Sequence, residues 1–199
     1  MAVDRTQLKR IGTIWTLAQD QPVQMVRPLV DAHFARVGPE AAGELAAAGS
    51  LSPDEIERRF ETGRWCYAAR SGDRLAAYGW ASFGEEYVGE LDLTLRLLPC
   101  EAYIWDCVTL PAFRQKYLYS ALLAFMAEAL KAESVCRIWI GADLDNQPSQ
   151  RGIDRAGFQR IADLAAGPDG TDCYVMLPYP GVPDALAQEA RRLFLSGCE

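Results

Sequence analysis

The residues best suited to chemistry lie in one stretch, residues 106–123, where an apolar run ends at Pro111 and two cations precede an apolar helical pattern. We expect residues 114–131 to run from a loop, which holds Arg114 and Lys116, into a helix. The first turn of a helix presents unpaired N–H groups and about half a positive charge, so it attracts anions. The stretch therefore fits a phosphate or pyrophosphate ligand, and it fits equally a solvated basic turn that holds no ligand.

Several catalytic classes lack the residues that they need. His33 is the one histidine, and the six cysteines form no CxxC pair. A zinc site needs several Cys or His ligands at short spacings, and Ser-His-Asp or Cys-His catalysis needs a histidine beside its nucleophile. The motifs GxSxG, GxxxxGK[ST] and GxGxxG do not occur. Histidine-dependent hydrolases, zinc enzymes and P-loop nucleotide hydrolases are therefore excluded, which leaves carboxylates, tyrosines, backbone dipoles or a cofactor.

The composition is typical of a globular domain. Of the 199 residues, 50% are hydrophobic and 24% are charged, which is enough to bury a core and too apolar for bulk disorder. The 20 basic and 27 acidic side chains give a net charge of −7, whereas nucleic-acid binding favours a basic excess. No signal-like segment is present, and no apolar run reaches the roughly 20 residues of a membrane span. We therefore expect a cytoplasmic protein with reduced cysteines and no nucleic-acid or membrane partner.

The elements that must position these residues form one mixed α/β domain over residues 1–199. Its core is expected over residues 32–178, with residues 1–31 as an N-terminal extension that holds a short alternating piece at 11–17. Strands are expected at 32–37, 65–70, 75–83, 91–97, 103–110, 137–142, 158–164 and 173–177. Helices are expected at 39–48, 52–63, within 114–131, at 147–156 and at 183–195. Ser52 with Pro53 is the clearest helix start, because serine caps a helix and proline suits its first position.

Three segments in a fixed order resemble the GNAT superfamily of acetyltransferases. Residues 111–123 are similar to its acyl-CoA signature, in which [R/Q]xxGx[G/A] follows a strand and opens a helix. Downstream, Asn146 followed by Gly-Ile-Asp-Arg-Ala-Gly-Phe at 152–158 resembles a second landmark of the family, an Asn, a short helix and a terminal Gly-Phe. Upstream, residues 65–69 and 72–79 resemble its central hairpin.

The resemblance covers residues 65–178 and implies a single GNAT-like domain, with a central, mostly antiparallel twisted sheet flanked by helices. It also implies acetyl-CoA or another acyl-CoA as co-substrate and no metal. The pyrophosphate would lie at the N–H groups of residues 115–119, and the pantetheine arm along 108–110. The residues expected to bind the cofactor are Val108, Thr109, Leu110, Arg114, Gln115, Lys116, Tyr117, Leu118, Tyr119 and Asn146.

The sequence departs from the family pattern at three positions. Tyr117 and Tyr119 occupy the places where the family has small residues that let the backbone approach the pyrophosphate. Ile153 stands where the family usually has a general-acid tyrosine, and it has no proton to donate. These departures favour a weakened or altered cofactor site.

In this superfamily the amine attacks the thioester directly, so a base must first deprotonate the amine. The resemblance makes Asp106 the leading candidate base, with a structural hydrogen-bonding role as its alternative, and Glu101 a second candidate. The pair at 85–86 is a further candidate whose plainer interpretation is a solvated loop. N–H groups near Cys107 and Val108 would stabilise the oxyanion. The Cys107 thiol is expected to be inert rather than to carry an acyl group.

Two functions follow from these residues. The first is a GNAT acyltransferase that acts on the amine of a small molecule or peptide. The second is a catalytically degenerate GNAT-like domain that works as a ligand-binding or interaction module. The helix expected at 183–195 is a packing element or the contact of a homodimer.

Overall fold

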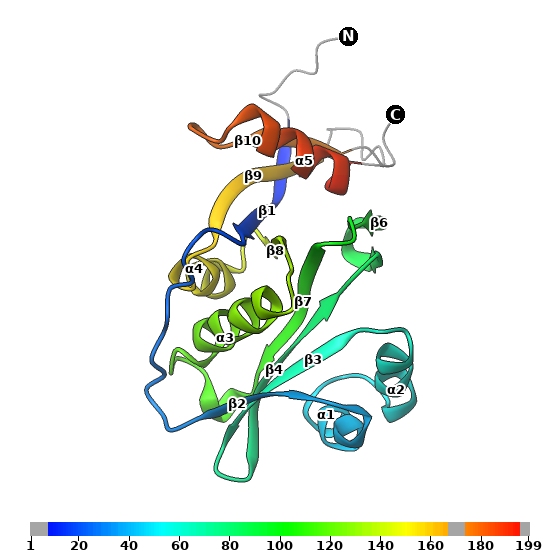
Figure 1. Ribbon diagram of the computed structural model, residues 1–199, viewed down its shortest axis with the longest axis vertical. Coiled ribbons are helices and arrows are strands. Elements are labelled where there is room, and N and C mark those ends of the chain that lie inside the picture. Colours follow the sequence, from blue (N-terminus) through cyan, green and yellow to red (C-terminus); the bar gives the residue numbers. More distant parts are fainter. Residues whose placement is uncertain (1–7, 167–173, 196–199) are drawn as a thin grey trace.

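The computed structural model describes residues 8–166 and 174–195 and forms one mixed α/β domain around a large twisted sheet (Figure 1). Its strands are β1 (Lys9–Ala18), β2 (His33–Val37), β3 (Trp65–Ser71), β4 (Arg74–Ser82), β5 (Glu85–Val88), β6 (Leu93–Arg96), β7 (Glu101–Thr109), β8 (Arg137–Asp143), β9 (Gln159–Ala166) and β10 (Tyr174–Pro178). Its α-helices are α1 (Ala42–Ala48), α2 (Pro53–Glu61), α3 (Leu118–Ala132), α4 (Gln147–Arg155) and α5 (Asp184–Phe194). Short 3-10 turns occur at Pro39–Ala41 (η2), Gly89–Leu91 (η3) and Pro111–Phe113 (η4).

The strand order in the large sheet is β10-β9-β1-β8-β7-β4-β3-β2. Each neighbouring pair is antiparallel except β7 and β8, which are parallel. Strands β5 and β6 form a separate antiparallel pair. The expected fold class, a mostly antiparallel sheet flanked by helices, is confirmed.

The N-terminal strand corrects one expectation. Residues 1–31 were expected to extend from the core, but β1 lies within the sheet between β8 and β9. Gly12 faces Asp143 on one side and Leu164 on the other. The alternating piece expected at 11–17 is part of this strand, but its place inside the sheet was missed because both of its partners, β8 and β9, lie far along the chain.

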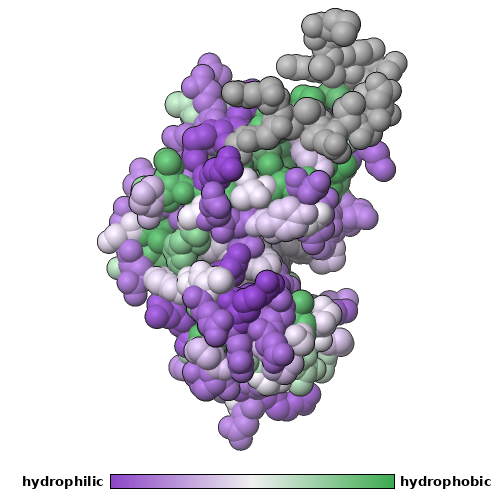
Figure 2. All heavy atoms as spheres, turned by 90° about the vertical axis from the view of Figure 1, so that its right-hand side faces the viewer, coloured by the Kyte–Doolittle hydropathy of each residue, from purple (hydrophilic) through white to green (hydrophobic). Residues whose placement is uncertain are grey.

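The helices cover the sheet in separate groups. Helix α3 packs on one face with Leu122 and Met126 in the main core, and α5 covers part of the other face, where Phe194 contacts Tyr103 and Trp139. Helices α1 and α2 pack against the β3–β4 end through a third cluster. Figure 2 shows the surface on that side, where hydrophilic residues dominate over α1 and α2 in the lower part of the molecule.

The starts of α2 and α4 follow the sequence directly. Ser52 accepts a hydrogen bond from the Glu55 N–H at 3.2 Å, as expected for the predicted cap. Asn146 accepts one from the Ser149 N–H, also at 3.2 Å, and so caps α4. The first of these caps places α2, and the second places α4, at the edges of the candidate site.

The cysteines differ from expectation. Cys100 and Cys136 form a disulfide, whereas Cys66 and Cys107 are free. The two bridged residues are 36 positions apart, and only the parallel pairing of β7 with β8 brings the starts of these strands together. Cys173 and Cys198 lie outside the described residues. Among the helices that the structure describes, none is both long enough and apolar enough to cross a membrane.

Candidate active site

The candidate site lies where the two parallel strands separate. β7 and β8 pair over four residues, from Glu101 opposite Arg137 to Ile104 opposite Ile140, and have no paired residues beyond that point. A cleft of about 1020 Å³ opens between their diverging ends. Beyond Ile104, the edge of β7 that faces β8 therefore has free backbone groups, as a strand does when its neighbour leaves.

A β-bulge shapes the β7 wall of this cleft. Tyr78 pairs with Val108, but Trp80 pairs with Trp105, so two β7 residues oppose one residue of β4. Asp106 takes up the extra length in a left-handed conformation, with φ of 42°. The opposing position is Gly79, where a Cβ atom would lie 2.7 Å from the Cys107 sulfur. The bulge therefore depends on glycine in β4.

The bulge also brings Trp105 and Asp106 to the same cation, although consecutive strand residues normally point to opposite faces. Arg59 of α2 donates from Nη1 to Asp106 Oδ2 at 2.5 Å, and its guanidinium lies 4.3 Å from the centre of the Trp105 ring. The centre of the Trp80 ring lies 5.2 Å from the same guanidinium. Arg59 is 9% exposed. Arg59 lines the cleft as a buried cation held by two aromatic rings and one carboxylate, and sequence reasoning missed it because α2 is far from β7 in the chain.

A second carboxylate, that of Glu86, also lines the cleft and is more deeply buried than Asp106. Glu86 is 4% exposed, and both Glu85 and Glu86 lie in β5, so the solvated loop expected at 85–86 is wrong, although Glu85 is exposed to solvent. Arg64 donates to Glu86 from Nε at 2.7 Å, and the Ser82 hydroxyl also donates to it. Ser82 in turn accepts a hydrogen bond from Trp105 Nε1 at 2.7 Å. Glu86 is thus neutralised and fixed in place.

Glu101 is not brought together with Asp106. It lies at the start of β7, five residues before Asp106 and therefore about 17 Å along an extended strand. It is 2% exposed and accepts hydrogen bonds from Arg192 Nη2 at 2.6 Å, Trp139 Nε1 at 3.2 Å and the Leu98 N–H at 2.8 Å. These contacts give Glu101 a structural role beneath α5, outside the set of residues that line the cleft.

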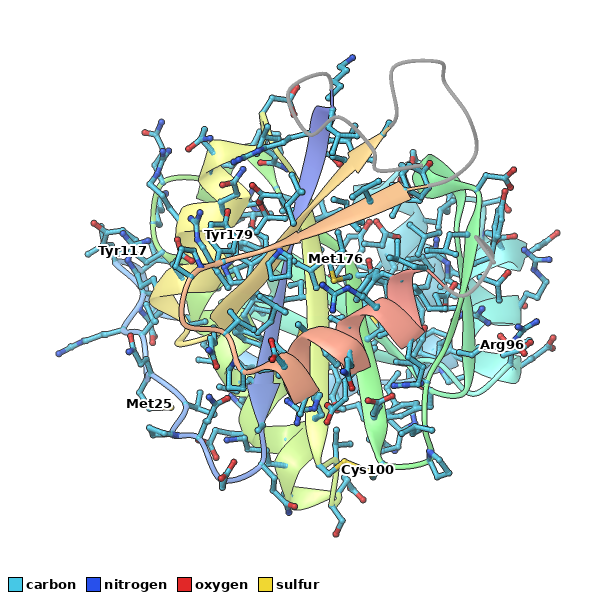
Figure 3. The ribbon with its side chains drawn as sticks, turned by 90° about the horizontal axis from the view of Figure 1, so that it is seen from above. Met25, Arg96, Cys100, Tyr117, Met176 and Tyr179 are labelled. Carbon is cyan, nitrogen blue, oxygen red and sulfur yellow. A yellow bond between two sulfur atoms is a disulfide. The ribbon has the colours of Figure 1, made fainter. Side chains whose placement is uncertain are left out.

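The two tyrosines of the β7–α3 loop adopt different positions. Tyr117 has a left-handed backbone, with φ of 59°, which is the conformation that glycine adopts most readily. Its ring is 43% exposed at the edge of the molecule, and the Arg155 guanidinium lies 4.4 Å from the ring centre (Figure 3). The Tyr117 ring therefore does not enter the cleft.

Tyr119, in contrast, lines the cleft. Its hydroxyl lies 2.9 Å from Ser149 Oγ, so the side chain connects the first turn of α3 to the first turn of α4. The ring occupies the space that a side chain at Gly152 would need, because a Cβ there would lie 2.3 Å from it. Burial raises the pKa of the Tyr119 hydroxyl, which keeps it protonated. Tyr119 is the side chain that narrows the passage between the two helices.

The polar side chains expected to bind cofactor are engaged within their own loops. Arg114 donates from Nε to the Thr109 carbonyl at 3.1 Å, and Lys116 donates from Nζ to the Ala112 carbonyl at 2.9 Å. Both are surface contacts that a ligand can replace. Asn146 is engaged as the cap of α4.

The start of α3 keeps free donors. Ala121 N–H reaches the Tyr117 carbonyl, but for the N–H groups of residues 118–120 no backbone partner is found in the part of the chain that the structure describes. The site therefore fits an acyl-CoA at two points, the open edge of β7 and the N-terminus of α3. Tyr119 restricts the passage that joins them.

The Cys107 thiol has the properties of an inert residue. Burial raises its pKa, and the Asp106 carboxylate raises it further. Its sulfur lies 3.6 Å from the Trp105 carbonyl oxygen. A protonated thiol is a poor nucleophile, which supports the expectation that Cys107 does not carry the acyl group. Across the described ranges, 8–166 and 174–195, no group of His, Cys, Asp or Glu is arranged to hold a metal ion.

Comparisons with known proteins agree with this geometry. A sequence profile described as the acetyltransferase (GNAT) family matches residues 35–158. This match spans more than half of the chain and includes both walls of the cleft. The chain belongs to the acetyltransferase (GNAT) family. No curated protein matches it by sequence.

Solved structures share the fold at low sequence identity. A GNAT-family acetyltransferase from Colwellia psychrerythraea is 13% identical, with a TM-score of 0.57, over 86% of this chain and 57% of its own length. A GCN5-related N-acetyltransferase from Kribbella flavida is 14% identical, with a TM-score of 0.52, over 87% and 60%. AAC(6')-Iy, in complex with the bisubstrate analogue CoA-S-monomethyl-acetylneamine, is 16% identical, with a TM-score of 0.51, over 65% and 91%. The chain thus spans less than two thirds of the first two proteins.

Proposed function

We propose that this protein is an N-acyltransferase that takes an acyl-CoA at the cleft between β7 and β8 and transfers the acyl group to an amine. The observation that supports it is the loss of β7–β8 pairing beyond Ile104, opposite a helix start with free N–H donors. The pantetheine arm carries amides that suit the open strand edge, and the diphosphate suits the start of α3. The acyl-CoA supplies the activated thioester; the remaining steps belong to this chain.

Within this proposal, Asp106 is the base that receives the proton of the attacking amine. It lines the cleft on the bulge, next to the N–H groups of Cys107 and Val108 that are proposed to stabilise the oxyanion. Arg59 fixes the orientation of its carboxylate. Glu101 is not part of the proposal, because its oxygens are engaged beneath α5.

A second candidate function rests on Tyr119. Its hydrogen bond to Ser149 closes the gap between the first turns of α3 and α4, where a long cofactor would need to pass. If that contact persists, the cleft is open to small ligands and closed to coenzyme A. The protein would then be a binding or interaction module that keeps the fold without the transfer reaction.

Calorimetric titration with acetyl-CoA separates the two functions. The acyltransferase requires saturable binding to the native protein, and no heat of binding at millimolar ligand overturns it. Tyr119→Ala is expected to bind acetyl-CoA about 5- to 10-fold more tightly, because it removes the ring from the passage. Tyr117→Ala is the matched control and should not tighten binding, since that ring lies outside the cleft.

The cytoplasmic location remains a prediction, and the disulfide bears on it. Disulfides are rare in reducing compartments, and Cys100 is exposed to solvent. Counting free thiols in protein trapped with an alkylating agent at cell lysis gives the test. If Cys100 and Cys136 are alkylated, their thiols were free, as expected in a reducing cytoplasm. If the disulfide protects both residues from alkylation, the protein comes from an oxidising environment.

A further inference from the structure

The cleft has two sides, and the side away from α3 carries an unsatisfied hydroxyl. Tyr103 of β7 is 7% exposed, and its ring contacts Phe194 of α5. It lines the cleft close to Gly141, where a Cβ would lie 3.7 Å from the Tyr103 hydroxyl. The hydroxyl forms no hydrogen bond with residues 8–166 and 174–195, and Tyr103 lines the cleft. A buried phenol that faces a cavity without a partner indicates a place for a polar ligand.

The charges around this hydroxyl are negative. Burial raises the pKa of Tyr103, and the carboxylates of Glu90, Glu86 and Asp143 raise it further, so all three act on this point of the cleft. Glu86 is neutralised by Arg64. Glu90 and Asp143 line the cleft, and neither forms an ion pair within the described part of the chain.

The cleft offers little compensating positive charge. Arg59 is the one Lys or Arg among its described lining residues, and Asp106 pairs with it. Tyr87 from the β5–β6 hairpin adds an aromatic ring to the wall on this side, whereas the Trp105 ring is already covered by Arg59. Ring faces attract cations. The chamber is therefore built for a positively charged group.

That group differs from the amine that reacts. A carboxylate near an amine favours its protonated form and so raises its pKa, which hinders nucleophilic attack. Glu90 and Asp143 would slow the reaction if they held the reacting nitrogen. They suit a second ammonium group that stays charged while another nitrogen of the same molecule reacts at Asp106.

We infer that the side of the cleft lined by Tyr103, Glu90 and Asp143 binds the non-reacting ammonium group of a diamine or polyamine acceptor. This inference rests on the proposed acyl transfer for its biological meaning, but the binding site stands on its own residues. The Tyr103 hydroxyl accepts a hydrogen bond from the ammonium group, and the two carboxylates supply the opposite charge.

Binding can be measured without acyl-CoA. We would titrate the native protein with diamines from 1,3-diaminopropane to 1,6-diaminohexane and with 1-aminobutane as the monoamine control, and record calorimetric heat and tryptophan fluorescence. At least one diamine is expected to bind about 10-fold more tightly than the monoamine, and to weaken as salt increases. If no diamine exceeds the monoamine by more than about 2-fold, the inference is wrong.

Charge-matched variants locate the site. Glu90→Gln and Asp143→Asn are each expected to weaken diamine binding about 3- to 5-fold. Tyr103→Phe should weaken it by a similar factor. None of the three variants should change monoamine binding. Glu85→Gln and Asp145→Asn remove the same charge from nearby positions that do not line the cleft, and they should have no effect. Equal losses in the control variants would reduce the effect to net charge and overturn the site. Thermal unfolding confirms that each variant is folded.

The outcome also separates this inference from the proposed function. If the protein prefers diamines but does not bind acetyl-CoA, the ammonium site is supported and the acyltransferase proposal is overturned. If the protein binds acetyl-CoA but transfers the acyl group equally well to diamines and to 1-aminobutane, the acyltransferase proposal is supported and the ammonium site is overturned.

Discussion

Arg59 carries its charge in a place that water hardly reaches, so its partner matters more than a surface ion pair would. Asp106 is the one carboxylate bound to it, and its Nε has no hydrogen-bond partner in the described structure. The aromatic rings on either side offset part of the cost of burial. A buried cation that loses its single anion keeps the full desolvation penalty.

We therefore expect Asp106→Asn to lower the free energy of unfolding by about 3 kcal/mol, in addition to any effect on catalysis. Urea unfolding at neutral pH measures it. Glu57→Gln, on the exposed side of α2, is the matched control and should change stability by less than about 0.5 kcal/mol. Equal stability of the two variants would show that Arg59 does not depend on Asp106.

The contact between Tyr119 and Gly152 makes a second prediction. Gly152→Ala would place a Cβ 2.3 Å from the Tyr119 ring and is expected to cost about 1–3 kcal/mol of stability. In a Tyr119→Ala background the same change should be neutral or stabilise by up to about 1 kcal/mol, because alanine favours helices over glycine. A double-mutant cycle in urea measures the coupling. Additive effects would mean that the ring can move away at no cost.

Asp154 gives the molecule a pH-dependent contact. Burial alone would raise the pKa of this carboxyl, but hydrogen bonds from Arg160 and Trp15 outweigh it and lower the pKa below its ordinary value. A lowered folded-state pKa contributes stability above the unfolded-state pKa of about 3.9 and loses it as the pH falls through the folded value.

Asp154→Asn should therefore lower the free energy of unfolding at pH 6. The loss should become smaller as the pH falls below the pKa of the Asp154 carboxyl in the folded protein. The difference is modest because 39% of the carboxylate side chain is exposed and solvent screens it. Urea unfolding of both proteins across pH 6 to about 2.5 gives the comparison. A constant difference at all pH values would contradict the linkage.

At the scale of elements, the disulfide ties together the starts of β7 and β8, at the closed end of the cleft (Figure 3). The Cys136 N–H also donates to the Cys100 carbonyl at 2.7 Å, so the covalent bond supports an existing contact. The strands are held here and separate at the other end. The disulfide therefore fixes the distance between β7 and β8 at one end of the cleft, and the divergence of the strands from that point sets the width at the other end.

Cys100→Ser with Cys136→Ser is expected to lower the free energy of unfolding by about 3–4 kcal/mol, as estimated from the entropy of closing a loop of this length. Guanidinium unfolding with and without a dithiol reductant measures it, since reduction of the native protein should reproduce the variant. If the reductant leaves the native protein unchanged while the variant is weakened, side-chain packing rather than the bond explains the loss.

The sequence predicts elements well where local chemistry decides them. The Ser52 cap, the hairpin of β3 and β4 and the apolar face of α3 each appear at the expected place. It fails where tertiary pairing decides. The position of β1, the burial of Glu86 and the Cys100–Cys136 bond all depend on which strands become neighbours, and no local pattern in the sequence shows that pairing.

The residues of the candidate site also divide into those that the sequence predicts and those that it does not. Asp106 and the β7–α3 loop could be found because a proline, two cations and a helix pattern are adjacent in the chain. Arg59, Glu90 and Tyr103 come from three separate elements, and no local spacing marks them as parts of one cleft. The direction of the two tyrosine rings was also unpredictable, because it depends on how α4 packs against α3.

At the scale of the molecule, β1 joins the two parts of the sheet. Its residues pair with both β8 and β9, so β9 and β10 connect to the rest of the sheet through it. Trp15 and Leu17 are fully buried on its inner face. A strand in this position belongs to the most stable part of the structure.

Trp15→Ala is accordingly expected to cost about 3–5 kcal/mol, which is a large share of the stability of a domain of this size. Hydrogen exchange of the native protein provides an independent measurement, because the β1 amides should exchange only through global unfolding. Faster exchange in β1 than in β7 would show that the sheet opens along this strand first.

During synthesis, β1 is made early, yet its neighbours β8 and β9 are not complete until residue 166 has left the ribosome. At about 5–20 residues per second, the strand waits on the order of ten seconds with both of its edges unpaired. Apolar strand edges in that condition associate with other chains. Pairing over such a long sequence separation is also slow once it becomes possible. The yield of folded protein in a cell therefore depends on what shields β1 during translation, and a slower ribosome or a missing chaperone would reduce it before the finished fold has any influence.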